Sequence, residues 1–126
     1  MAKRAAAFES VSLLFRWRPG RQGTGYRKML LAEGKCWDCY LIDYPPGAGV
    51  PDHRDPVPGK QHHRLNITVW GDPRRFAAQT DIVAQVRDEF ELWLGQRIVR
   101  FRPDHITHSV RPSLERRLVL SIGWVR

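Results

Sequence analysis

The stretch DYPPGAGVPDHRDP, residues 43–56, places a proline- and glycine-rich loop directly before His53 and Asp55. Residues two apart in a β-strand project from the same face, so the spacing predicts that the His53 and Asp55 side chains converge while Arg54 faces away. A histidine and a carboxylate that converge in this way form a metal site only if a third ligand comes from elsewhere in the chain. A solvated turn can contain the same pair by chance.

On both sides of this loop the sequence consists of short alternating segments separated by turn residues, which predicts an all-β barrel or sandwich. Residues 80–90 are the exception, because their apolar residues have helical spacing; a short helix and a crossover loop both remain open there. Residues 5–14 are similarly open between a helix and an edge strand. The predicted strands lie within residues 25–44 (two strands joined at Glu33–Gly34), 52–55, 63–70, 74–79, 90–103 (a hairpin turning at Gly95–Gln96), 105–110 and 116–125.

The bulk properties are those of an ordinary globular protein. A length of 126 residues predicts one domain over residues 1–126. No window of 18 apolar residues occurs, so no membrane span is predicted. The N-terminal apolar run is interrupted by Glu9, Ser10 and Ser12, and we interpret it as mature protein in the cytoplasm, not as a signal peptide.

The net charge of +8 favours an anionic partner, such as an acidic polypeptide or an anionic small molecule. Nucleic acid is less favoured, because the basic residues are spread along the chain without an RNA-binding motif.

The two cysteines form Cys36-Trp37-Asp38-Cys39. A strand places positions three apart on opposite faces, so we expect two reduced structural cysteines there, neither a zinc site nor a disulfide.

The third metal ligand is expected among the remaining histidines. Two neutral imidazoles and one carboxylate on one face of an ion form the triad suited to non-haem Fe(II), with coordination positions left open. His108, at the start of a strand after the turn Pro103-Asp104, is the best candidate. His105 lies within that turn and is expected to point elsewhere.

A basic residue at the start of the last strand indicates an anion-binding site. Arg117 is costly inside a barrel unless it meets an anion, and its planar fork matches a carboxylate. The other possibility is that Arg116 and Arg117 are both solvated at the strand end. Alternation in this strand places Leu118, Leu120, Ile122 and Trp124 on one face, and Arg117, Val119, Ser121 and Gly123 on the other.

With these residues the sequence resembles the Fe(II)/2-oxoglutarate-dependent dioxygenase superfamily, in particular its prolyl-hydroxylase-like branch. The resemblance covers residues 36–126, through YPPGAGVPDHRDP, HRLNITVW, RIVRFRPDHITHSV and ERRLVLSIGW. It implies an all-β double-stranded β-helix (a jelly roll, or cupin-like barrel), here with one or two short flanking helices.

The resemblance also implies an activity: hydroxylation of a protein side chain or small molecule, with release of succinate and CO2. His53, Asp55 and His108 then bind Fe(II), and Arg117 pairs with the distal carboxylate of 2-oxoglutarate. Tyr44 stands where a tyrosine helps hold that carboxylate in relatives, and Ser121 is assigned to the same cofactor site.

Further assignments around the site remain open. Asn66 either reaches the co-substrate or bonds backbone, and the second is preferred. Residues 54–63 form a candidate lid whose Arg54, His62 and His63 contact substrate. Val119 stands where the superfamily's nucleic-acid demethylases tend to carry asparagine, which again weighs against nucleic acid.

A cupin-type metal protein that does not use 2-oxoglutarate is the main alternative function, and a non-catalytic basic interaction module is the third possibility.

Overall fold

The computed structural model describes residues 14–20, 23–78 and 90–126, and these residues form ten β-strands and one short 3-10 turn. The described part of the chain contains no α-helix, and none of its helical turns is long and apolar enough to cross a membrane. The helices considered at 80–90 and 5–14 lie outside the described residues, apart from Phe90, which begins β7, and Leu14, which forms an isolated bridge to Leu30. The strands are β1 (Trp17–Pro19), β2 (Arg27–Glu33), β3 (Trp37–Tyr44), β4 (Val50–His53), β5 (His62–Trp70), β6 (Phe76–Ala78), β7 (Phe90–Trp93), β8 (Ile98–Phe101), β9 (His108–Val110) and β10 (Arg117–Val125), with the 3-10 turn at Pro73–Arg75.

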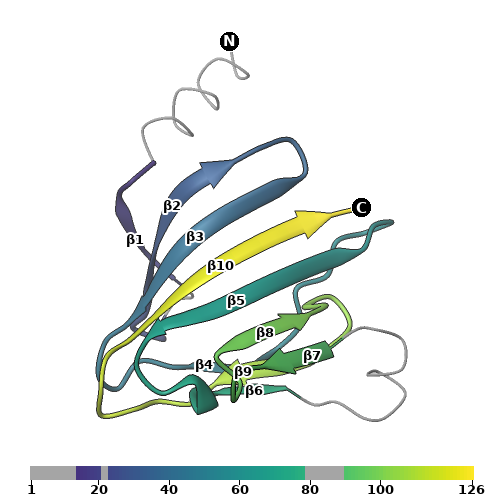
Figure 1. Ribbon diagram of the computed structural model, residues 1–126. Helices are drawn as coiled ribbons and strands as arrows, with labels where there is room; N and C mark the ends of the chain where they lie inside the picture. Colours follow the sequence, from purple (N-terminus) through teal and green to yellow (C-terminus); the bar gives the residue numbers. More distant parts are fainter. Residues whose placement is uncertain (1–13, 21–22, 79–89) are drawn as a thin grey trace.

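The strands form two antiparallel sheets that pack against each other (Figure 1). The larger sheet has the order β1-β2-β3-β10-β5-β8-β7, and the smaller has the order β4-β9-β6. Strands far apart in the sequence are therefore neighbours, as in a jelly roll. The all-β, jelly-roll prediction is confirmed, and the seven-stranded sheet also includes β1 and β2.

The central strand β10 shows the alternation that the sequence predicts. Its buried residues are Arg117, Val119, Ser121 and Gly123, and the residues between them are partly exposed. Strand β10 pairs with β3 on one side and β5 on the other; Arg117 has a register partner only in β3, and the other three inward residues have one in both neighbours. Two of the resulting rows across the sheet are Tyr40, Ser121 and Asn66, and Asp38, Gly123 and Arg64.

The hydrophobic core fills the space between the sheets at one end. Phe101 of the larger sheet is 1% exposed, and its ring centroid lies 4.9 Å from that of Phe76 in the smaller sheet. Burying an aromatic side chain of this size contributes about 1.5–3 kcal/mol. The inner faces of β3, β5 and β10 beyond this core carry polar side chains, and these line a cavity.

The strand predicted at residues 52–55 is displaced in the structure. Strand β4 covers Val50–His53 and ends at His53, so Asp55 lies beyond it. The convergence of His53 and Asp55 therefore cannot come from strand alternation alone. It depends on contacts made by the segment that follows β4.

Candidate metal centre

Three potential metal ligands converge where β4 pairs with β9. Their ligand atoms all lie within 4.8 Å of one another. The Asp55 Oδ2 atom is 3.5 Å from His53 Nε2 and 3.4 Å from His108 Nε2. His53 and His108 are direct partners in the antiparallel register, which places their ring centroids 4.1 Å apart. A pairing across two strands thus joins residues that are 55 positions apart in the sequence.

Both imidazoles are oriented by backbone carbonyls. The Nδ1 atom of His53 lies 2.8 Å from the Pro51 carbonyl oxygen, and that of His108 lies 2.8 Å from the Ile106 carbonyl oxygen. A carbonyl only accepts, so each Nδ1 donates and the neutral ring presents an Nε2 lone pair. Two such lone pairs and a carboxylate oxygen then face one another, and a bound cation satisfies this arrangement.

Contacts with the turn before β9 hold Asp55 in place. The Asp55 amide donates to the Pro103 carbonyl at 2.7 Å. Next to it, Arg54 Nε donates to Thr107 Oγ1 at 2.9 Å. These two bonds join the segment after β4 to the segment 102–107, which explains why Asp55 reaches the histidines although it lies outside the strand.

A buried ion pair stabilises this turn. Arg102 donates to Asp104 through Nε at 3.2 Å and Nη2 at 2.6 Å. Burial by itself raises the pKa of Asp104, but the Arg102 hydrogen bonds, the His62 backbone amide and the Arg102 charge together lower it. The exposed His105 ring lies near the same pair, 3.2 Å from Arg102 Nη2. His105 therefore points away from the three converging ligands, as expected.

Replacing Asp104 by asparagine is expected to reduce the free energy of unfolding by about 2 kcal/mol at neutral pH, because a buried guanidinium loses its counter-ion. The folded-state pKa of Asp104 lies below its ordinary value of 3.8, so this stabilisation is complete above pH 3.8 and disappears as the pH falls through the folded-state pKa. Urea unfolding at a series of pH values measures the difference. Asp72→Asn, at an exposed pair with Arg74, is the control and should change stability little. Equal effects of the two substitutions at neutral pH would contradict this role of Asp104.

Arg117 is buried with unused hydrogen-bonding capacity. It is 4% exposed, and its Nε and Nη1 atoms have no hydrogen-bond partner among the described residues. Its Nη2 atom lies 3.4 Å from Thr68 Oγ1, and its guanidinium carbon lies 5.1 Å from the centroid of the Tyr44 ring. Burial lowers the pKa of Arg117 and raises that of Tyr44 to about 12. A buried cation with two open donors fits the carboxylate of a bound anion.

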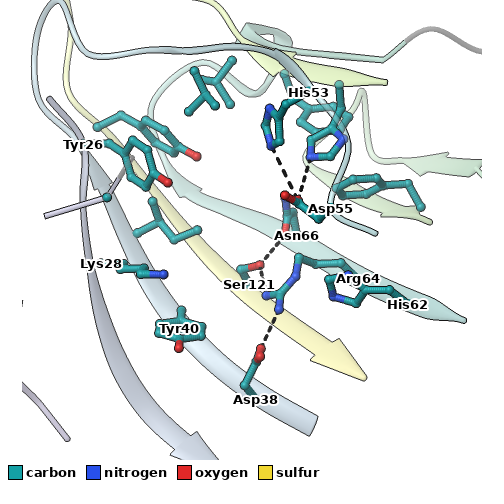
Figure 2. A pocket seen from close by; sticks show the side chains of 18 of the residues that line it. Tyr26, Lys28, Asp38, Tyr40, His53, Asp55, His62, Arg64, Asn66 and Ser121 are labelled. Atoms are coloured by element: carbon teal, nitrogen blue, oxygen red, sulfur yellow. Dashed lines mark hydrogen bonds and ion pairs between the residues drawn. The ribbon is translucent and has the colours of Figure 1, made fainter. Parts of the chain in front are cut away.

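A cavity of about 540 Å³ connects the three ligands with the polar inner face of the larger sheet, and this size is typical of small-molecule sites. Figure 2 shows His53 and Asp55 at one end and Asp38 and Tyr40 at the other. Tyr44 and Ser121 line the cavity, as does Asn66, but Arg117 does not.

A hydrogen-bonded chain along the cavity was not foreseen from the sequence. Arg64 donates to Ser121 Oγ at 2.7 Å and to Asp38 Oδ1 at 2.6 Å, and Ser121 donates to Asn66 Oδ1 at 2.6 Å (Figure 2). Asn66 thus bonds a side chain, contrary to the preferred backbone role. Arg64 follows two histidines at the start of a strand. Only the register of β10 against β5 and β3 indicates that its side chain crosses β10 and reaches Asp38 on β3.

The segment predicted as a lid is attached at both ends. Arg54 bonds Thr107, and Gln61 exchanges two backbone hydrogen bonds with Arg126. His62 lines the cavity, whereas His63 is buried and stacks on Trp124 with ring centroids 5.6 Å apart. Of the two, only His62 is therefore placed to contact a ligand in the cavity.

Cys36 and Cys39 are both free thiols.

No family model matches the chain, and no curated protein matches it in sequence. Several solved structures resemble it in fold. A prolyl-4-hydroxylase from Pseudomonas putida has a TM-score of 0.61 and 16% identity, over 99% of this chain and 84% of that chain. A Rhodobacter sphaeroides complex of SigE with the anti-sigma ChrR has a TM-score of 0.54 and 20% identity, over 86% of this chain and 48% of that chain. This chain thus spans about half the length of that one.

A cupin domain from Schizosaccharomyces pombe also resembles the chain, with a TM-score of 0.50 and 10% identity over 88% of this chain and 69% of that chain. Identities this low relate the proteins by fold and not by activity. The described strands, their order in the two sheets and these likenesses agree on one architecture. The chain has the jelly-roll fold of the cupins, which it shares with a prolyl hydroxylase.

Proposed function

We propose that the chain is an Fe(II)- and 2-oxoglutarate-dependent dioxygenase, acting as one domain, which hydroxylates a substrate with release of succinate and CO2. The observation that carries the proposal is the meeting of His53, Asp55 and His108 at the end of a cavity. Two imidazoles and one carboxylate are the ligand set of non-haem Fe(II) enzymes with open coordination positions. Bound iron supplies the oxygen chemistry that no amino-acid side chain provides.

The chain's own residues hold the ligands and shape the site. The carbonyls of Pro51 and Ile106 fix the two imidazoles with Nε2 toward Asp55. His108 is buried against Phe101, at a centroid distance of 4.9 Å, while the side chain of Asp55 is 37% exposed. The apolar contacts exclude water from one side of the site, and the carboxylate side opens into the cavity, where substrate is bound.

The second part of the proposal assigns the carboxylate of 2-oxoglutarate to Arg117. Its Nε and Nη1 atoms have no hydrogen-bond partner among the described residues, which supports this role, since a carboxylate accepts hydrogen bonds from a guanidinium. Tyr44 lines the cavity beside Arg117, and with a pKa of about 12 its hydroxyl stays protonated at neutral pH. It can therefore donate to an anion without repelling it.

One observation favours the alternative, a cupin-type metal protein that does not use 2-oxoglutarate. Arg117 is not among the residues that line the cavity. If no ligand reaches the guanidinium, the Arg117 side chain only packs against Tyr44 and Thr68. The alternative keeps the metal and removes the co-substrate, so one titration separates the two.

The test is to add Fe(II) and then 2-oxoglutarate to the protein without oxygen and to record the visible charge-transfer band of the chelate. We expect saturable appearance of the band, followed by release of succinate when air is admitted. Fe(II) binding without a 2-oxoglutarate-dependent band would establish the cupin-type alternative. Absence of any Fe(II) binding would leave the basic interaction module as the function.

A further inference from the structure

The end of the cavity away from the metal ligands is positively charged and has no part in the chemistry proposed above. Lys28, Arg64 and Asp38 lie at this end (Figure 2), and Arg18, the register partner of Lys28, also lines the cavity. Lys28 Nζ lies 5.0 Å from the centroid of the Tyr40 ring. Three cations against one carboxylate, within a concave surface, attract an anionic ligand.

Arg64 reaches this position because β10 carries a glycine beneath it. Arg64 lies on β5 and Asp38 on β3, and both pair with Gly123 on the strand between them. A Cβ on Gly123 would lie 2.1 Å from Arg64 Nη2, so only glycine lets the guanidinium cross β10. The larger sheet is therefore built to present Arg64 across its inner face.

Asp38 holds Arg64 through a contact that a ligand can replace. The Asp38 side chain is 34% exposed, and it accepts from Arg64 Nη2 at 2.6 Å. A partly exposed ion pair adds little to stability. Exchange of Asp38 for another carboxylate therefore costs little, whereas the bond from Arg64 Nη1 to Ser121 keeps the guanidinium in place.

We propose that Arg64 and Lys28 bind a carboxylate of the substrate, and that Asp38 occupies this carboxylate position when substrate is absent. The substrate class is then a small organic acid that extends from the cation pair toward His53 and Asp55. This inference rests on the proposed function in identifying the ligand as the substrate. The recognition of the carboxylate itself does not depend on metal.

The test uses hexanoate as the probe and its uncharged analogue hexanamide as the comparison, titrated into the full metal-free chain and followed by backbone amide chemical shifts. We expect hexanoate to shift the amides of Lys28, Tyr40 and Arg64 in a saturable way, and hexanamide to bind at least about tenfold more weakly. Equal binding of the two probes, or shifts that centre on His53 and His108, would overturn the proposal.

Three variants should change hexanoate binding, two of them weakening it and one strengthening it, and a fourth is the control. Arg64→Gln and Gly123→Ala should each weaken hexanoate binding about tenfold, because one removes the guanidinium and the other displaces it. Asp38→Asn should strengthen binding several-fold, because it removes the internal competitor. Arg100→Gln is the control, since Arg100 pairs with Glu91 and does not line the cavity. Weaker binding in Asp38→Asn, or no change in Arg64→Gln, contradicts the assignment.

The outcome is distinguishable from failure of the proposed function. If the Fe(II) and 2-oxoglutarate band forms in Arg64→Gln as in wild type while hexanoate binding is lost, both proposals stand. If the band is absent in wild type but hexanoate still depends on Arg64, the carboxylate site stands and the dioxygenase assignment falls. Loss of the band in Arg64→Gln would instead assign Arg64 to 2-oxoglutarate and overturn its role toward substrate.

Discussion

Replacement of His108 by alanine is expected to lower Fe(II) affinity by at least about 100-fold, more than the loss of a residue that merely orients a ligand. The reason is that His108 supplies one of three ligand atoms lying within 4.8 Å of one another. The 2-oxoglutarate-dependent visible band should then disappear at Fe(II) concentrations that saturate the wild type. Anaerobic titration followed by absorbance measures both effects.

His105→Ala is the matched control for this substitution. His105 is three residues earlier, is exposed, and contacts the Arg102–Asp104 pair outside the metal centre. It should leave Fe(II) affinity unchanged. Because His108 is buried against Phe101, Asp55→Asn provides a second test that removes a ligand charge at a more exposed position. If His108→Ala and Asp55→Asn both fold and both still bind Fe(II) as the wild type does, the metal centre is wrongly assigned.

Replacement of Arg117 by methionine is expected to have opposite effects on binding and on stability. Affinity for 2-oxoglutarate should fall about 100-fold, since the two unpaired donors at Nε and Nη1 are lost. The free energy of unfolding without ligand should rise by about 1–3 kcal/mol, because a buried charge whose Nε and Nη1 atoms have no partner among the described residues is replaced by an apolar side chain of similar length. Chelate titration and urea unfolding of the same preparations measure the two quantities.

Arg116→Met is the control, because it makes the same change one residue earlier. Arg116 is exposed, and its Nε lies 3.1 Å from Asp43 Oδ1 on the other face of the sheet. This variant should lose a little stability and bind 2-oxoglutarate as wild type does. If Arg117→Met destabilises the protein and leaves 2-oxoglutarate affinity intact, Arg117 is a packing residue and the cupin-type alternative gains support.

The fold was predictable from local patterns because alternation in a strand is a local property. The residues of β10 show this clearly, since the inward row Arg117, Val119, Ser121 and Gly123 follows directly from a period of two. The hairpin between β7 and β8 also turns where Gly95–Gln96 indicates, with Gly95 at φ +61°. The segment 80–90, where the pattern left helix and loop open, lies outside the described residues except for Phe90 at the start of β7.

The candidate ligands were predictable for a different reason. A pair such as His53 and Asp55 has few uses at that spacing, and His108 lies at the start of a strand after the turn Pro103-Asp104. The geometry that joins them was not predictable in the same way, because β4 ends at His53. Asp55 reaches the site through its bond to the Pro103 carbonyl, a contact between segments almost 50 residues apart in the chain.

The sequence by itself determined the strand pattern, the inward face of β10 and the identity of the three candidate ligands, because each depends on periodicity or residue chemistry within a short stretch. Only the tertiary structure decided which inward residues share a cavity. The register of β10 against β3 and β5 places Arg64 across Gly123 beside Asp38, and it places Arg117 against Tyr44, which lines the cavity although Arg117 does not. Register between strands distant in the chain is set by the packing of the whole sheet, and no local pattern encodes it.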